Sequence, residues 1–267
     1  MKYYIRLLLV SLCCISCNGK DSRSTVVTTD SSAIEKKLKE AVAANPDSML
    51  LKENLLQYYR DNGEYDMAIA TANEALKKDS NNSRLWKIKA TLHFEDEDTA
   101  NAILSFEKAA TLYPDPQYIL ALGTLYAETK NAKALNMANE LLKVKKETND
   151  KEAFFIRGIY YNYTGDKTKA IIELDKCLSL DYTYMLAYRE KAIALYDQGK
   201  YDAGVKVLDK ALALQNNFDE GYYWRGRCLE NLLQPNDAIE AYRKALLYSP
   251  DYEEAQEALI RLEGKTN

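Results

Sequence analysis

The sequence predicts an all-α protein, a right-handed α-solenoid built from helix-turn-helix repeats. Small residues recur along the chain at intervals of 34 positions, and each interval contains two stretches whose apolar residues have helical spacing. In the interval 219–252, Gly226 lies on the first stretch, Pro235 interrupts the helix, and Ala238 and Ala245 lie on the second. Two helices and a turn in an interval of this length are typical of stacked repeats, in which neighbouring units share one core.

This register divides residues 32–263 into a half repeat, six full repeats and a capping helix. The half repeat spans 32–48, where Ser32 and Glu35 have the spacing of a capping box at a helix start and Pro46 ends the helix. The full repeats are predicted at 49–82, 83–115, 116–150, 151–184, 185–218 and 219–252.

The third repeat is irregular, because its turn near Lys130 and Asn131 is short and a longer exit then restores the register. Residues 253–263 place Ala255 and Leu259 on one helix face and acidic side chains elsewhere. This pattern predicts a helix that caps the solenoid and solvates its end.

Short side chains occupy the positions at which the paired helices must approach most closely, since backbones come near only where side chains are small. With the exceptions of Leu56 and Leu141, these positions hold Gly, Ala or Cys. In the turns between helices, Gly63, Gly165 and Gly199 are expected to take the positive φ that ends a helix. The close-approach positions are 56, 90, 123, 158, 192 and 226 on the first helices, and 68, 102, 134, 170, 204, 238, 75, 109, 141, 177, 211 and 245 on the second.

Residues 83–114 match a known repeat pattern in detail. The matching side chains, in order, are Trp86, Ala90, Ala102, Phe106, Ala109 and Pro114. Lys89 and His93 depart from the Leu and Tyr of the pattern. The pattern resembles the tetratricopeptide repeat, and the resemblance extends over 32–263. It implies a superhelix whose first helices line a concave groove that binds peptide or protein partners.

The amino-terminal segment has the layout of a signal peptide, predicted at 1–16. It carries Lys2 and Arg6, then an apolar run at 7–12, then small residues. The apolar run is about ten residues, against the ~20 that a membrane-spanning helix needs. Export followed by cleavage is therefore expected.

The residues before Cys17 resemble the lipobox of bacterial lipoproteins, which implies that Cys17 becomes the acylated first residue. Cys14 stands where the pattern usually has Leu, and Cys13 and Cys14 remain alternative acylation sites. Several acyl chains, palmitate among them, anchor a protein stably in a membrane. Residues 17–31 would then be the lipidated cysteine and a flexible, Ser- and Thr-rich tether.

The residue after Cys17 is Asn18, and by resemblance to lipoprotein sorting rules it favours the outer membrane. The expected location is the cell envelope, as an outer membrane lipoprotein that faces the periplasm or the cell exterior.

Few residues suit catalysis, metals or cofactors, and none of these is expected. His93 is the only histidine, and it occupies a position that Tyr59 and Tyr126 fill in other repeats, which predicts core packing. Cys177 and Cys228 lack a CxxC spacing and replace small core residues. The acidic run 95–98 predicts a solvated loop, and a net charge of −4 without a basic cluster argues against nucleic-acid binding.

The groove positions that the family resemblance implies give the candidate partner-binding residues. Aromatic side chains beside arginines are typical of binding hot spots, which favours the carboxyl-terminal half. The candidates are Arg84, Lys87, Phe155, Asn162, Tyr163, Arg189, Tyr196, Tyr223 and Arg227. Relatives that hold the carboxylate of chaperone tails use a Lys, Asn, Asn, Lys, Arg set, whereas this chain has Glu53, Gln57, Ile88, Gln117 and Ala121.

The sequence thus predicts a non-catalytic scaffold or adaptor, lipid-anchored at the bacterial cell envelope. A self-associating structural protein of the envelope, and so a homo-oligomer, is the alternative. A cell-wall enzyme is disfavoured, because the chain lacks a histidine pair and a domain outside the repeats.

Overall fold

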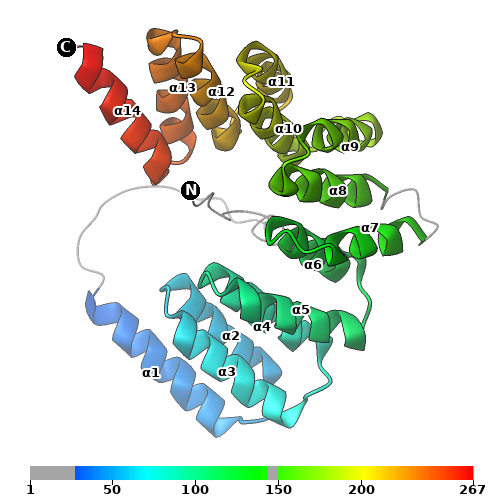
Figure 1. The fold of residues 1–267 in the computed structure, drawn as a ribbon. Helices are drawn as coiled ribbons and strands as arrows, with labels where there is room; N and C mark the ends of the chain where they lie inside the picture. The colour runs from blue at the N-terminus through cyan, green and yellow to red at the C-terminus, as the bar shows by residue number, and fades with distance from the viewer. Residues whose placement is uncertain (1–27, 144–149, 267) are drawn as a thin grey trace. The chain divides into compact units, whose positions relative to one another are not determined.

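The computed structural model describes residues 28–143 and 150–266, and these residues form 14 α-helices and no strand (Figure 1). The predicted all-α repeat fold is confirmed. The predicted signal peptide and Cys17 lie outside the described residues. The helices are α1 (Thr28–Ala44), α2 (Met49–Asp61), α3 (Tyr65–Lys78), α4 (Ser83–Glu95), α5 (Thr99–Leu112), α6 (Pro116–Glu128), α7 (Lys133–Lys143), α8 (Asp150–Thr164), α9 (Lys167–Leu180), α10 (Met185–Asp197), α11 (Tyr201–Leu214), α12 (Asp219–Asn231), α13 (Pro235–Tyr248) and α14 (Glu253–Thr266).

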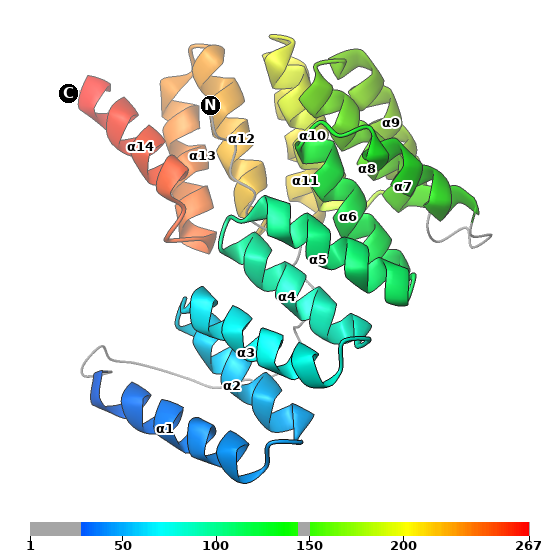
Figure 2. The ribbon, with the colours of Figure 1, turned by 60° about the horizontal axis from the view of Figure 1, so that its bottom comes forward.

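The chain divides into two compact units, 1–122 and 123–267, with the boundary inside α6. In the first unit, α1 to α5 pack in succession, each helix against the next (Figure 2). In the second unit the same succession holds from α7 to α14. Even-numbered helices from α2 to α12 are the first helices of their repeats, and each is followed by its second helix.

The turns inside the repeats share one backbone conformation, whichever residue they contain. Gly63, Gly165 and Gly199 have φ of 71°, 95° and 72°, as the sequence predicts. The three remaining turns place Glu97, Lys130 and Leu233 in the same left-handed region, at φ of 59°, 59° and 58°. A side chain is disfavoured there, so the repeat geometry determines the turn even where the residue does not suit it.

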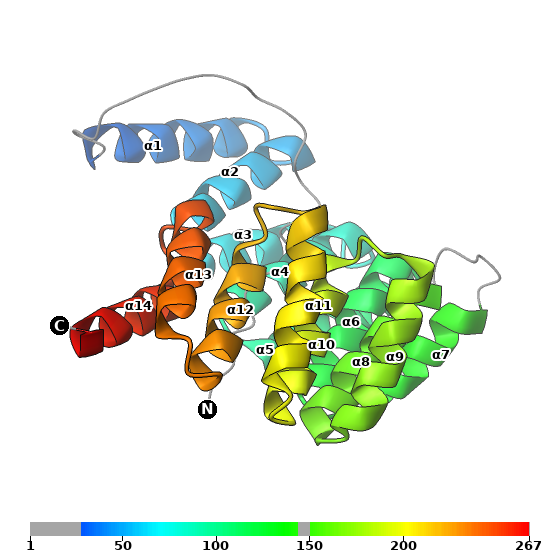
Figure 3. The ribbon, with the colours of Figure 1, turned by 90° about the horizontal axis from the view of Figure 1, so that it is seen from above.

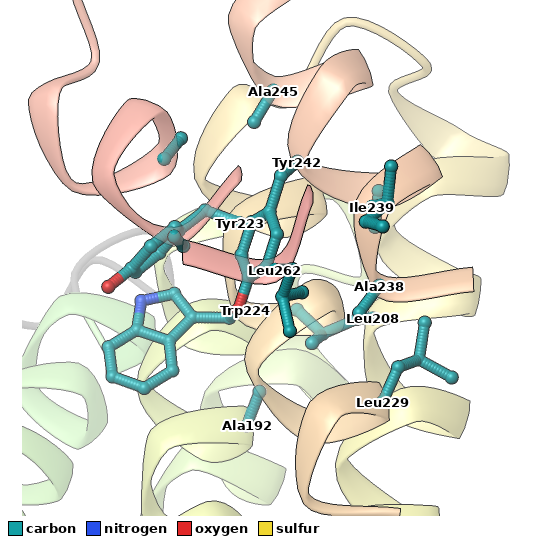
Figure 4. Close-up of a cluster of buried hydrophobic side chains, with 13 residues drawn as sticks. Ala192, Leu208, Tyr223, Trp224, Leu229, Ala238, Ile239, Tyr242, Ala245 and Leu262 are labelled. Carbon is teal, nitrogen blue, oxygen red and sulfur yellow. The ribbon is translucent and has the colours of Figure 1, made fainter. Parts of the chain in front are cut away.

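Close approach of the paired helices explains the small residues. A Cβ added at Gly226 would come within 2.6 Å of Tyr242 Cε1, and one at Gly158 within 2.7 Å of Leu174 Cδ2. Ala238 and the other alanines at these positions are buried. Figure 4 shows one resulting core, in which side chains from α10 to α14 meet around Tyr242.

Helix α1 differs from the sequence prediction at its start. It begins at Thr28, so Ser32 lies inside the helix and not at a capping box. Glu35 instead accepts a hydrogen bond from the Tyr59 hydroxyl at 3.1 Å and pairs with Lys39 at 2.7 Å. Contacts with the next helix therefore use the residue that the sequence assigned to a cap.

The irregular third repeat and the last helix also have defined bounds. The turn of the third repeat runs from the end of α6 at Glu128 to the start of α7 at Lys133, and the longer exit at 144–149 lies outside the described residues. Helix α14 continues to Thr266, beyond the predicted end at 263.

Candidate functional site

The first helices of successive repeats lie side by side in the second unit. Helix α10 contacts both α8 and α12, so these three helices form one layer, here called the first-helix wall (Figure 3). Polar side chains connect its members: Asn162 on α8 donates to the carboxylate of Glu190 on α10 at 3.1 Å. Several of the predicted site residues on these three helices take part in side-chain hydrogen bonds. They are Asn162, Arg189, Tyr196, Tyr223 and Arg227.

Arg189 is the most strongly held charge of the wall. Its Nη1 lies 2.7 and 2.9 Å from the two carboxylate oxygens of Glu220, and its Nη2 lies 2.9 Å from Glu190 Oε1. Burial lowers the pKa of the guanidinium, but the carboxylates of Glu220 and Glu190 outweigh burial and raise it. Arg189 is thus a mostly buried cation that links α10 to α12 through Glu220.

Arg227 lies among aromatic rings. Its guanidinium carbon is 5.2 Å from the ring centre of Tyr196, 5.8 Å from that of Tyr223 and 5.6 Å from that of Trp224. It donates to the Tyr223 hydroxyl at 2.8 Å and to the Tyr196 hydroxyl at 3.1 Å. Asn231 donates to the same Tyr196 hydroxyl at 3.0 Å. The sequence-predicted residues Tyr196, Tyr223 and Arg227 are therefore brought together.

Tyr223 belongs largely to the core. Its ring packs against Trp224, Tyr242 and Tyr252, with centroids 4.9 to 5.9 Å apart, and the residue is buried (Figure 4). Its hydroxyl also accepts a hydrogen bond from Arg227, so the buried ring helps to fix the orientation of that guanidinium. The partly buried side chains of Tyr196 and Arg227 are the more accessible members of the group.

Phe155 departs from its predicted position in a groove. Its ring is fully buried and its centroid lies 4.9 Å from that of the Tyr184 ring, so it is a core residue and does not line a surface. Asn162 is also buried, and its amide oxygen accepts from Lys167 at 2.7 Å. Tyr163 is partly buried. The position of a residue within the repeat does not by itself distinguish a groove position from a core position, because each helix has neighbours on several sides.

The two predicted residues of the first unit, Arg84 and Lys87, lie on α4. The side chain of Arg84 is 72% exposed and donates to Glu53 on α2 at 3.0 Å. Lys87 is partly buried. Nearby, Arg60 on α2 donates to Glu95 on α4 at 2.7 Å, so first helices are joined by ion pairs in this unit also.

Three carboxyl residues near the wall, Glu128, Glu190 and Glu220, are not among the residues that the sequence predicts for the site. The sequence does contain a periodic signal for one of them. Arg189 and Glu220, which are hydrogen-bonded, are separated by 31 positions. The same separation of 31 joins Arg84 to Glu53, Arg227 to Tyr196, and Arg261 to Glu230. A charged or phenolic residue 31 positions from an arginine therefore indicates a contact between first helices, or between α12 and α14.

The structure also places the histidine and two cysteines that the sequence offered as candidates for catalysis or metal binding. His93 Nδ1 lies 3.4 Å from Asp98, and burial lowers the pKa of its imidazole. Burial raises the pKa of the Cys177 thiol and that of the Cys228 thiol to about 12. Within residues 28–143 and 150–266 there is no group of three or more His, Cys, Asp or Glu placed to hold a metal. No helix in that part of the chain is long and apolar enough to cross a membrane.

Antiparallel helix pairs with left-handed turns, small residues at each close approach and links between successive first helices define a helical-repeat protein. Models of the tetratricopeptide repeat match residues 35–83 and 53–116, then 151–184, then 219–252. The chain belongs to the tetratricopeptide repeat family.

Relatives of known sequence or structure agree with this assignment. Tetratricopeptide repeat protein 16 of Macaca fascicularis is 24% identical over 227 residues, 76% of this chain, and the chain spans about a quarter (26%) of the length of that relative. The crystal structure of a tetratricopeptide repeat protein from Parabacteroides merdae has a TM-score of 0.73 at 20% identity, over 88% of this chain and 93% of that one. The APC/C hetero-tetramer Cut9–Hcn1 has a TM-score of 0.60 at 18% identity, over 87% of this chain and 47% of that one. At these identities the solved structures show a shared fold.

Proposed function

We propose that this protein is a non-catalytic adaptor whose first helices bind a segment of a protein partner. The observation that carries the proposal is the group around Arg227, in which one arginine and the rings of Tyr196, Tyr223 and Trp224 gather on the first-helix wall. Aromatic and arginine side chains held rigidly by their neighbours are the residues that most often dominate protein interfaces. The hetero-tetramer of the Cut9–Hcn1 structure supports protein partners as the kind of ligand.

Rigidity makes this group suitable for binding. The hydrogen bonds from Arg227 to two tyrosines fix the guanidinium before any partner arrives, so little side-chain entropy is lost on association. Tyr196 is partly buried, which leaves part of its ring for contact from outside.

We further propose that the adaptor is tethered to the bacterial envelope by acylation of Cys17. The motif before Cys17 supports this location, and the residues themselves lie outside the described part of the chain. Metabolic labelling with palmitate tests it: label should enter the wild-type protein and be lost in Cys17→Ser. Unchanged labelling of that variant would refute acylation at this cysteine, and loss only in Cys13→Ser or Cys14→Ser would move the anchor.

A photo-crosslinking residue at position 196 tests the binding surface. p-Benzoylphenylalanine replaces Tyr196 in one full-length variant and Tyr182, which is 67% exposed in a turn, in a matched control. Irradiation in intact cells should give a discrete heavier product from position 196 and none from position 182. Equal products from both positions would contradict a specific surface. A product of twice the mass of the chain would instead support the self-associating alternative.

A further inference from the structure

In the second unit Arg189 is hydrogen-bonded to two carboxylates and acts electrostatically on a third carboxyl, that of Glu128. The hydrogen bonds that Arg189 donates within the described residues all go to Glu190 and Glu220. Both oxygens of Glu220 accept from Arg189, and the second oxygen of Glu190 accepts from Asn162. Each oxygen of these two carboxylates therefore accepts a hydrogen bond.

Glu128 carries the third carboxyl, and one of its oxygens has no hydrogen-bond donor among the described residues. It is the last residue of α6, and its Oε2 is buried without a hydrogen-bond partner in the described part of the chain. Burial and the nearby charge of Glu190 raise the pKa of Glu128 to about 8, although Arg189 acts in the opposite direction. A buried carboxyl oxygen without a donor is costly, so such a group in a native structure calls for an explanation.

Lys167, the cation that contacts Asn162 of this group, already has its own partners. Lys167 on α9 pairs with Asp197 at 2.6 Å and donates to the amide oxygen of Asn162 at 2.7 Å. Asp219 and the Tyr252 phenol also interact electrostatically with Glu220, and neither of them can supply a positive charge. The cluster thus holds more potential negative charge than positive charge.

We propose that Glu128, with Glu190 beside it, receives the lysine or arginine side chain of a bound partner, so that the protein selects basic segments. This inference rests on the proposed binding function and names its partner class. Glu128 as a whole is partly exposed and precedes an exposed turn at Thr129 and Lys130, so a partner can approach the residue from outside although its Oε2 is buried. Pairing restores the charge balance that Arg189 alone leaves incomplete.

The chemistry of binding is an exchange of one proton for one cation. In the free protein the Glu128 carboxyl retains its proton at neutral pH, and on binding it releases that proton to solvent and accepts a hydrogen bond from the ammonium or guanidinium group. Affinity for a basic segment should therefore rise as pH increases from 6 to 8.5, a range in which lysine and arginine stay charged.

Selection from a random peptide library tests the inference directly. Phage-displayed peptides of about 12 residues are selected on the full-length wild-type protein, on Glu128→Gln and on a control, Glu140→Gln. The control removes a carboxylate from α7 whose side chain is 52% exposed and pairs with Lys143. Wild type and control should select peptides with a lysine or arginine at one fixed position, and Glu128→Gln should lose that preference.

Affinity measurements on one selected peptide complete the test. Replacing its basic residue by norleucine should weaken binding to the wild type at least tenfold and binding to Glu128→Gln less than threefold. Calorimetry in buffers of different ionisation enthalpy should show proton release for the wild type only. Peptides without a basic preference, or a preference unchanged in Glu128→Gln, would overturn the inference while leaving the binding function standing. Failure to select any peptide would overturn both.

Discussion

Arg189 on α10 and Glu220 on α12 form a two-oxygen ion pair, with Nη1 2.7 and 2.9 Å from the carboxylate oxygens, across 31 positions of sequence. The pair is mostly buried and joins the first helices of adjacent repeats. In a repeat protein each unit is stabilised chiefly by its neighbours, so a buried link of this kind affects the coupling between units.

Arg189→Ala should destabilise the protein strongly. The change leaves Glu190 and Glu220 buried near each other without a cation, and removing one partner of a buried pair costs about 3–5 kcal/mol. Urea denaturation followed by circular dichroism measures the loss. Glu220→Gln in the Arg189→Ala background should recover part of it, whereas an additive or larger loss would show that the two residues are not coupled.

Glu128→Gln should stabilise the protein in a pH-dependent way. The pKa of Glu128 is about 8 when folded against a model value of 4.5, so its favourable contribution is complete at low pH and is lost as pH rises through 8. Between pH 6 and pH 8 the variant should gain about 2 kcal/mol in free energy of unfolding relative to the wild type. A difference between the two proteins that stays constant over this range would contradict the raised pKa.

Leu233→Gly should also stabilise the protein. Leu233 has φ of 58° and its side chain is 88% exposed, so glycine relieves backbone strain and removes little packing. The expected gain is about 1 kcal/mol. Gly199→Ala in the equivalent turn, at φ of 72°, is the converse change and should lower stability by a similar amount. Thermal denaturation measures both changes in stability. Opposite changes of similar size would show that backbone strain at the turn is their common cause, whereas a change in only one variant would indicate a local effect at that site.

Gly226→Ala should destabilise the carboxyl-terminal repeats. The new methyl group would lie within 2.6 Å of the Tyr242 ring, and forcing such an overlap in a packed core costs about 1–3 kcal/mol. Gly264→Ala on α14 is the matched control, because no atom lies within 4 Å of its added Cβ. That control should be neutral or slightly stabilising through helix propensity.

Tyr223→Ala should unfold part of the second unit as well as alter binding. The ring packs against Trp224, Tyr242 and Tyr252, and truncating a buried aromatic residue costs about 3–5 kcal/mol. Tyr196→Phe is the sharper probe of the surface, because it keeps the ring and removes only the hydroxyl that accepts from Arg227 and Asn231. Melting temperatures of the two variants should differ widely.

Much of the fold was readable from the sequence because it depends on local, repeated constraints. Small residues equivalent to Gly226 and Ala238 recur at the repeat interval, and the turn glycines mark the ends of first helices. The start of α1 was not readable, since Glu35 satisfied a capping pattern but is used in a contact with Tyr59.

The site was less predictable, for two physical reasons. Phe155 and Tyr196 occupy comparable first helices, yet one is buried and the other partly exposed, because burial depends on neighbouring repeats. Glu128 carried no sequence signal at all, since its raised pKa arises from its depth and from Glu190, 62 positions away in the chain. The central claim, that the carboxyl cluster of Glu128, Glu190 and Glu220 lacks a cation which a partner supplies, therefore depends on Glu128.

Carbon-13 NMR titration of the Glu128 carboxyl, assigned by its absence in Glu128→Gln, tests that claim most directly. The free protein should show this carboxyl titrating near pH 8, and a bound peptide that carries the selected basic residue should lower its pKa by more than two units. A Glu128 carboxyl that titrates near 4.5 in the free protein, or that does not respond to the peptide, would contradict the account.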